Sequence, residues 1–426
     1  MKVIARLLLL NLCVPLAVAG QGSPEFRLQL QPALLSATNV FTNGVWSVRV
    51  ADDVVGPWLP IQNVFTTSTV SQVSISTTGA AGFFHAEALD LSPGRAGFTN
   101  LTRAYGLLST IAGAGGPQDV NNWRAEFEGA SATAAVLSGP HMSMADRAGF
   151  IYIADKDAHG IRKLLPDGTI VTVAGTSTPG NAADGPIVAT QGSLSAPNGL
   201  WVRGDGTLYI LDLGNGKIRR VDTNGTMTTM FTVPGGISTG RGLWVSDDET
   251  VAYVSSSTIV KKWTAAGGVT NFSLGYAELG NLVIDPWGNL VVTDRGLHRV
   301  YRVDTSGNRT AIAGNGGTSG GGDGMLATAT ALEEVRGVWF LPTGAYLVAT
   351  HRSSRAWYVD TDGYIHLLLQ GTRFGTHAGD GTWFYNLAEA RISECRAITL
   401  DYEGNMLITE NDAGFIRKVR FLPFSP

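Results

Sequence analysis

Residues 206–226, GTLYILDLGNGKIRRVDTNGT, decide the fold of this chain because the chain repeats them. The stretch reads as a strand at 208–211, a turn at 212–217, a second strand at 218–221 and a closing turn at Asn224 and Gly225. Two strands joined in this way form one antiparallel β-meander unit.

The same spacing recurs in other parts of the chain. In each full copy an apolar strand ends in one polar residue, and five residues separate it from the next strand; the pairs are Asp155 and Ile161-Arg162, Asp212 and Ile218-Arg219, Asp294 and Val300-Tyr301, Thr350 and Ala356-Trp357, and Glu410 and Ile416-Arg417. A further copy at 254–261 is two residues shorter, which makes six copies. Such regular spacing indicates a repeat architecture.

The two ends of the repeated region predict that it closes into a ring. Residues 107–116, LLSTIAGAGG, match the last strand of a repeat, as in TAIAGNGG at 310–317, but no earlier strands of that repeat precede them. The last copy, at 416–422, lacks this final strand. An N-terminal strand that completes the last unit would close the ring and remove exposed sheet edges.

Several motifs of the copies resemble the NHL repeat, a family of six-bladed β-propellers. They are APNGLWV at Ala196, GTLYILD at Gly206, GKIRRVD at Gly216, VTVAG at Val171, GGGDG at Gly320 and HAGDG at His377. The resemblance covers residues 106–422, about three quarters of the chain. It implies an all-β fold with a six-bladed β-propeller at 106–426, in which the N-terminal strand closes the last blade, preceded by a small β-module.

The first 19 residues, MKVIARLLLLNLCVPLAVA, have the features of a secretory signal peptide. Lys2 and Arg6 precede an apolar run, and Ala17 and Ala19 are the small residues expected before a cleavage site at Gly20. No later run reaches the roughly 20 apolar residues of a membrane-spanning helix. We therefore expect a secreted protein, periplasmic or extracellular, without an integral membrane segment.

Residues 24–95 lack the repeat, and we expect a small β-module there, followed by a linker at 96–105. Short runs at 45–50, 58–64, 70–76 and 82–89 predict strands. The segments GPWLPIQ at Gly56 and GFFHAEALDLSP at Gly82 resemble a small β-module found ahead of larger domains in exported bacterial proteins. Its aromatic residues would be either its core or a platform for stacking sugars, and we expect the core; they are Trp46, Trp58, Phe83 and Phe84.

Charge and cysteine content argue against several classes of function. Removal of Lys2 and Arg6 with the signal leaves 29 basic and 35 acidic residues, a net charge of about −6, without a Lys/Arg cluster. Such a chain is a poor partner for nucleic acid. Cys395 alone remains after processing, so no intrachain disulfide is expected. Motifs typical of a nucleophile elbow, a phosphate-binding loop or a dinucleotide site do not occur in a suitable context.

Residues that recur in most copies are expected to build the blades. The carboxylates of Asp155, Asp212 and Asp294 are predicted to accept backbone N–H bonds from the turn that follows each of them. The recurring arginines are predicted to lie on the solvent side of the third strand and to bridge to acids of nearby turns or to carbonyls of neighbouring blades; they are Arg162, Arg219 and Arg417.

Positions at which the copies differ point to a binding site. Alignment of the innermost strands puts one residue of each blade on a ring at the entrance of the central channel: Pro140, Asn198, Arg241, Gly280, Arg336 and Arg396, with His141 next to the ring. Guanidinium groups that converge on a concave mouth favour a carboxylate, sulfate or phosphate, or the acidic groups of a polysaccharide or protein. Alternatively, each arginine pairs with a local acid, such as Asp401 or Glu334, and seals the junction between two blades.

We therefore expect a monomeric, non-catalytic binding scaffold for an anionic, protein or carbohydrate ligand, without a cofactor or metal. The alternative is a metal-dependent lyase or hydrolase, similar to lactonases, with calcium or zinc in the channel. Its candidate ligands would be Asn198, His141, His351 and Glu410. A third possibility is an extracellular structural protein that its β-module tethers to a matrix.

Overall fold

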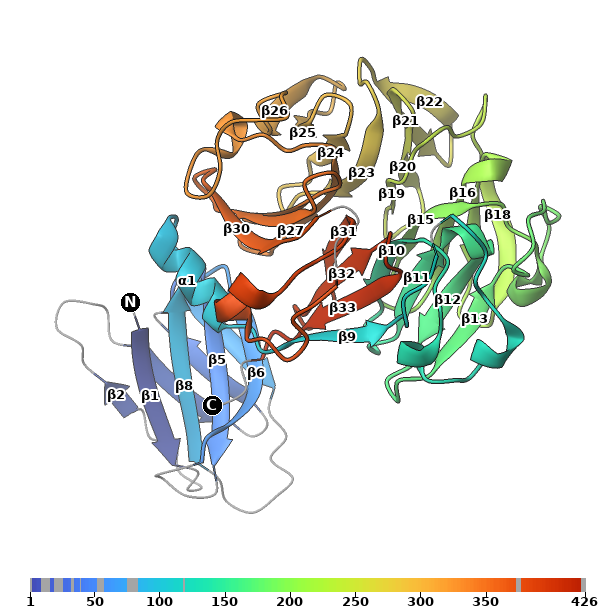
Figure 1. The fold of residues 1–426 in the computed structure, drawn as a ribbon. Coiled ribbons are helices and arrows are strands. Elements are labelled where there is room, and N and C mark those ends of the chain that lie inside the picture. Colours follow the sequence, from blue (N-terminus) through green and yellow to red (C-terminus); the bar gives the residue numbers. More distant parts are fainter. Residues whose placement is uncertain are drawn as a thin grey trace.

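The structure is a computed structural model that describes residues 2–8, 16–18, 26–31, 34–38, 40–51, 57–74, 83–117, 119–372 and 377–422. It consists almost entirely of β-strands. Figure 1 shows two parts, a small pair of sheets at the N-terminus and a larger ring of sheets beside it.

Two four-stranded sheets form the N-terminal part. One sheet has the order β1 (Lys2–Leu8), β8 (Phe83–Asp90), β5 (Gly44–Ala51), β6 (Leu59–Thr66). The other has the order β2 (Leu16–Val18), β3 (Phe26–Gln31), β4 (Leu34–Thr38), β7 (Val70–Ser74). Leu35 of β4 and Val73 of β7 pack in one buried cluster with Trp46 of β5 and Phe84 of β8. The two sheets therefore form a β-sandwich with a shared core.

The expected core role is confirmed for Trp46 and Phe84, which are 0% and 4% exposed. Trp58 is partly buried and meets the ring of His85 edge to face at 5.2 Å. The side chain of Phe83 lies outside the described residues, and so does the predicted cleavage site at 19–20. β1 and β2 fall within the segment predicted to be the signal peptide, and β1 pairs with β8 along its whole length.

The segment predicted to be a linker is mostly helix α1 (Arg95–Arg103). Phe98 of this helix stacks on Tyr358 and His366, with ring centroids 5.9 Å and 4.8 Å apart. Leu101 and Tyr105 are fully buried and belong to a cluster that contains residues of both the sandwich and the ring. The helix therefore fixes the sandwich against the ring, and Figure 1 shows it between them.

Six mainly four-stranded antiparallel sheets follow in chain order within the described residues. The first sheet consists of β10 (Pro140–Ala145), β11 (Ile151–Asp155), β12 (Gly160–Leu164) and β13 (Ile170–Ala174). The second consists of β15 (Pro197–Val202), β16 (Leu208–Asp212), β17 (Lys217–Val221) and β18 (Thr226–Thr232), with β14 (Ile187–Val188) at its edge. The third consists of β19 (Leu243–Val245), β20 (Val251–Ser256), β21 (Ile259–Thr264) and β22 (Gly268–Ser273).

The last three sheets complete the ring. The fourth sheet consists of β23 (Leu279–Ile284), β24 (Leu290–Asp294), β25 (Arg299–Val303) and β26 (Arg309–Ala313). The fifth consists of β27 (Val335–Phe340), β28 (Tyr346–Thr350), β29 (Arg355–Val359) and β30 (Ile365–Gln370). The sixth consists of β31 (Cys395–Leu400), β32 (Met406–Glu410) and β33 (Phe415–Val419), together with β9 (Leu108–Ala112). Short 3₁₀ helices lie in the loops: η1 (Ala125–Phe127), η2 (Ala132–Ala134), η3 (Lys156–Ala158), η4 (Ala189–Gln191), η5 (Leu213–Asn215), η6 (Ala327–Ala329) and η7 (Phe384–Glu389).

The sheets stand around a common axis, so the ring is a β-propeller (Figure 1). Its predicted closure is confirmed, because β9 pairs with β33 and places Leu108 opposite Val419 and Ala112 opposite Ile416. The shortened copy is also as expected, since only Ser257 and Thr258 separate β20 from β21.

The predicted position of the recurring arginines was wrong. Arg162, Arg219 and Arg417 are 0% exposed. The Nε of Arg219 lies 3.0 Å from Oδ2 of Asp212, which is also fully buried. A sheet of a propeller packs against a neighbouring sheet on each face, so the third strand offers an arginine no solvent side, and a buried cation requires a buried partner.

The recurring carboxylates mostly bind the loop before the blade and not the turn after the strand. Oδ1 of Asp212 accepts the N–H of Ser195 at 2.8 Å. Asp155 accepts the N–H of Ser138 in the same way. Of the three, Asp294 makes the predicted bonds, because it accepts the N–H groups of Gly296 and Leu297 at 3.1 Å.

An Asp-x-x-Gly turn follows the innermost strands β23 and β31. Oδ1 of Asp285 accepts the N–H groups of Trp287 and Asn289 at 3.0 Å and 2.8 Å. Gly288 completes the turn with a φ of 85°, a conformation that favours glycine. Residues 401–405 repeat this arrangement, again with a φ of 85° at Gly404. These turns set the shape of one end of the channel.

Candidate functional site

The innermost strands place the predicted site residues at one end of the channel. In β10, β15, β27 and β31 the pairing with the next strand shifts register at the second residue, which is His141, Asn198, Arg336 or Arg396. Such a β-bulge turns a side chain away from the regular alternation of the strand. Arg241 lies just before β19, at the corresponding point of its blade. In the first blade the bulged residue is thus His141 and not Pro140.

Two of the three arginines are paired with acids. Nη2 of Arg336 donates to Oε2 of Glu334 at 3.2 Å, and its Nη1 lies 3.7 Å from Oε1 of Glu394. Nε of Arg396 contacts the same carboxylate of Glu394. The local-acid alternative therefore describes Arg336 and Arg396. Its other named acid, Asp401, pairs with Lys418 at 3.0 Å instead.

His351, in the turn after β28, completes this cluster. One of its ring nitrogens contacts Glu334 and the other contacts Glu394. Hydrogen bonds from His351 and Arg336 lower the pKa of Glu334 to about 2 against the opposing effect of its own burial. Burial, together with the nearby Asp412 carboxyl, raises the pKa of Glu394. Because carboxylates on both sides hold its ring, His351 fixes Glu334 and Glu394 relative to each other.

Arg241 differs from the other two arginines. It is 8% exposed and forms no ion pair with a described carboxylate, and its Nε and Nη1, like those of Arg336, have no hydrogen-bond partner among the residues that the structure describes. Burial lowers the pKa of Arg241 well below its usual value, and the neighbouring cations Arg336 and Arg295 add to this effect. A buried, unpaired guanidinium is costly unless a ligand or water supplies its partners.

The Glu394 and Glu278 carboxyl groups stabilise the Arg241 cation, but they do not outweigh its burial and the neighbouring cations. Burial and the charges of Arg241 and Lys156 lower the pKa of His141 well below its usual value, so that its imidazole is neutral at neutral pH. Asn198 donates from Nδ2 to the carbonyl of Gly240 at 2.7 Å, and its Oδ1 has no partner in the described part of the chain. This end of the channel, which we call the arginine mouth (His141, Asn198, Arg241, Arg336 and Arg396), therefore has a positive potential.

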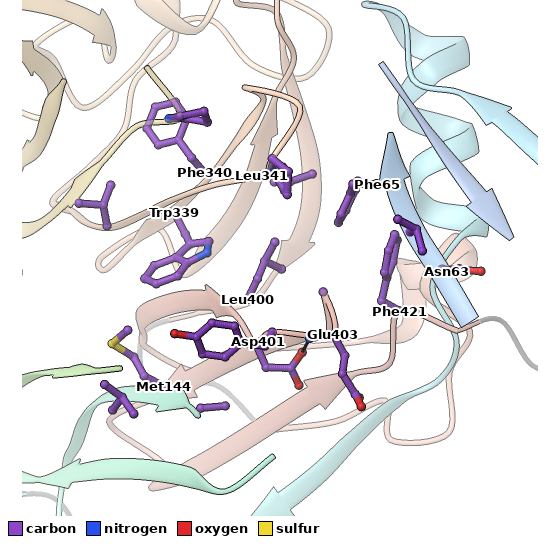
Figure 2. A pocket seen from close by; sticks show the side chains of 18 of the residues that line it. Asn63, Phe65, Met144, Trp339, Phe340, Leu341, Leu400, Asp401, Glu403 and Phe421 are labelled. Carbon is purple, nitrogen blue, oxygen red and sulfur yellow. Dashed lines mark hydrogen bonds between the residues drawn. The ribbon is translucent and has the colours of Figure 1, made fainter. Parts of the chain in front are cut away.

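The opposite end of the channel contains a cavity of about 550 Å³. Its lining comes from the ends of β10, β15, β23, β27 and β31, from the turns after them and from β6 of the sandwich. Figure 2 shows Phe65 and Asn63 of the sandwich on one side and Trp339 and Met144 of the propeller on the other. We call this space the junction cavity, and its volume lies within the range of about 300–1,000 Å³ that is typical of small-molecule sites.

Tryptophans that the sequence analysis did not single out dominate this end of the channel. Trp201, Trp244 and Trp339 are partly exposed, and the ring centroids of Trp201 lie 6.2 Å from those of both others. Each tryptophan follows a ring position by three residues, after Asn198, Arg241 and Arg336, in the segments GLW, GLW and GVW. This repeated spacing was a signal that the sequence contained. The contribution of β6 had no such signal, because it depends on how the sandwich docks.

Among the described residues, no group of three or more His, Cys, Asp or Glu side chains could hold a metal ion. Cys395 is fully buried, and burial raises the pKa of its thiol, as expected for a core residue. Within the same part of the chain, no helix has the length and apolar character needed to cross a membrane.

Comparisons with known proteins support the fold. No family model and no curated protein matches the chain. A Bacteroides thetaiotaomicron protein of unknown function has a TM-score of 0.60 and 14% identity, over 94% of this chain and 98% of its own. Auxiliary nutrient binding proteins from Bacteroides thetaiotaomicron and Bacteroides ovatus both have TM-scores of 0.55, with 13% and 12% identity, over 91% and 92% of this chain and 93% and 94% of their own.

The fold and the two channel ends define the class of this molecule. It is a β-propeller with an N-terminal β-sandwich, and its channel is cationic at one end and aromatic at the other. At 12–14% identity the likeness extends to the fold and carries no ligand with it.

Proposed function

We propose that this protein is an exported, monomeric, non-catalytic binding protein of the NHL type, whose arginine mouth binds a carboxylate-bearing or sulfated ligand. The observation that carries the proposal is Arg241, which is 8% exposed, has no ion pair with a described carboxylate, and leaves its Nε and Nη1 without a hydrogen-bond partner among the described residues. Guanidinium groups form paired hydrogen bonds with planar carboxylates and with sulfate, and such bonds are stronger when water is excluded.

The neighbouring pairs support this role for Arg241. Because Glu334 and Glu394 already hold Arg336 and Arg396, these arginines contribute positive potential and a fixed shape more than free donors. Asn411 donates to the carbonyl of Pro140 at 3.1 Å and accepts from Arg396 at 2.9 Å, which fixes the wall further. A prearranged wall around the guanidinium of Arg241 lowers the entropic cost of binding.

The test uses citrate, sulfate and digalacturonate as probes in isothermal titration calorimetry. We expect at least one of these anions to bind the native protein, and the Arg241→Met variant to lose at least tenfold in affinity. The Arg124→Met variant is the matched control, because the side chain of Arg124 is 70% exposed outside the arginine mouth. Equal affinities in the native protein and Arg241→Met, or no binding of any of the three anions, would contradict the proposal.

A further inference from the structure

The junction cavity has a composition that suits a different ligand from that of the arginine mouth. Its floor is apolar and aromatic, with the partly exposed indoles of Trp201 and Trp339 beside Met144 and Leu400. A ligand that covers such a floor is stabilised in proportion to the apolar area that it removes from water. Concave apolar surfaces of this kind are the usual walls of small-molecule sites.

The charges of the lining favour a neutral ligand. Its described residues include the carboxylates of Asp285, Asp401 and Glu403, and no lysine, arginine or histidine. Asp285 is held from outside the cavity by Arg302 at 2.9 Å, as Asp401 is by Lys418. Both carboxylates also accept the backbone bonds of their turns. The cavity therefore repels anions without presenting a strong net charge.

The arrangement of the tryptophans argues against an enclosed cation. The ring centroids of Trp201 and Trp339 are 6.2 Å apart with the planes inclined by 35°. This separation leaves no room for a group between the two rings, so they form one continuous wall. Cation binding in aromatic cages uses rings that surround the charge on several sides, whereas a wall suits the face of a flat ring.

Polar groups surround this wall at the rim. The amide of Gln62, the hydroxyl of Tyr402 and the carboxylate of Glu403 belong to exposed residues of the lining, and Tyr402 is 50% exposed. Together they offer donors and acceptors above an apolar floor. A pyranose ring has the matching chemistry, because its C–H face is apolar and its hydroxyls both donate and accept. We propose that the junction cavity binds a neutral carbohydrate.

This proposal gives the β-sandwich a role in binding. The strand β6 supplies the wall opposite the tryptophans, as Figure 2 shows for Asn63 and Phe65. Phe65 stacks on Phe421 with ring centroids 4.3 Å apart. Nδ2 of Asn63 donates to the carbonyl of Ala104 at 2.7 Å. The wall is therefore held by the propeller and by the residue that follows α1.

The junction cavity and the arginine mouth lie at opposite ends of the channel, so binding of a neutral oligosaccharide at one is measured independently of anion binding at the other. The intact native protein is screened on an array of neutral plant and microbial oligosaccharides, and the strongest binder is titrated by calorimetry. We expect such a binder, with an affinity that falls about tenfold or more in both Tyr402→Ala and Trp339→Ala. Since the side chain of Tyr402 is half exposed, Tyr402→Ala should fold even if Trp339→Ala does not.

Tyr385→Ala is the matched control, because Tyr385 is 55% exposed in η7 and does not line the cavity. It should bind the oligosaccharide as the native protein does. The proposal is overturned if no neutral oligosaccharide binds, if Tyr402→Ala binds as well as the native protein, or if choline chloride binds in a Tyr402-dependent way while all neutral oligosaccharides fail.

Discussion

Replacing Arg241 with methionine should make the protein more stable. Methionine keeps an unbranched apolar stem in the same space and removes the guanidinium, whose Nε and Nη1 lack partners in the described part of the structure. The same substitution at Arg219 should have the opposite effect, because Arg219 is fully buried and bonded to Asp212 at 3.0 Å and to Thr229 at 2.6 Å. One chemical change, made at two buried arginines, thus separates a binding group from a structural one.

The size of both effects follows from the contacts. An unsatisfied buried donor costs about 1–3 kcal/mol, so Arg241→Met should raise the free energy of unfolding by about that amount. Removal of one partner of a buried ion pair costs about 3–5 kcal/mol, which applies to Arg219→Met because Asp212 is left without its cation. The entropy of unfolding is about 2.1 cal/mol/K per residue. For a folded unit of roughly 300 residues, a change of 1 kcal/mol in the free energy of unfolding therefore shifts Tm by about 1.5 °C.

We therefore expect Tm to rise by about 1.5–4.5 °C in Arg241→Met and to fall by about 4.5–7.5 °C in Arg219→Met. Differential scanning calorimetry of the three proteins, in a buffer free of polyvalent anions, measures both shifts. Arg241 would be a structural residue, and the reasoning on the arginine mouth refuted, if Arg241→Met lowered Tm as Arg219→Met does. Addition of a binding anion should then raise the Tm of the native protein and not that of Arg241→Met.

Three further outcomes are expected. The pKa of His141 is lowered in the folded protein, so below pH 6.5 the unfolded chain binds a proton that the native state does not. As the pH falls below 6.5, the free energy of unfolding should therefore decrease by up to about 1.4 kcal/mol per pH unit. Urea unfolding at several pH values measures this, and the free energy of unfolding should depend less on pH in His141→Gln. Metal analysis of the purified protein should find no stoichiometric calcium or zinc, whereas a stoichiometric ion bound in the channel would favour the lyase or hydrolase alternative. The intact mass of the exported protein should correspond to a chain that starts at Gly20, and a mass that includes residues 1–19 would contradict the predicted cleavage.

Local patterns made much of the fold predictable. The spacing of the copies marked each pair of central strands, and the unmatched strand at 107–116 predicted the closure that β9 makes with β33. The alignment of the copies also placed Asn198, Arg241, Arg336 and Arg396 at one end of the channel, because equivalent positions of repeated units lie at equivalent places around a ring. The same alignment contained the tryptophans of the other end.

The burial of the recurring arginines was not predictable in this way. Arg219 was expected on a solvent side because alternation along a strand separates two faces, but both faces of a blade are covered. The ion pairs of the ring arginines, by contrast, have a local basis, since Glu334 and Glu394 precede Arg336 and Arg396 by two residues, whereas Thr239 stands at that place before Arg241. This difference between Arg241 and Arg336 was a signal that the sequence contained.

The sequence by itself determined the all-β class, the repeated units and the closing strand, because these follow from spacings of a few residues and from short turns. The tertiary structure alone decided that the recurring arginines are buried and where the sandwich docks. Both depend on contacts between residues distant in the chain, such as Phe65 with Phe421, and a docked surface leaves no periodic trace in the sequence. The junction cavity exists for the same reason, since its two walls come from β6 and from the ends of the innermost strands.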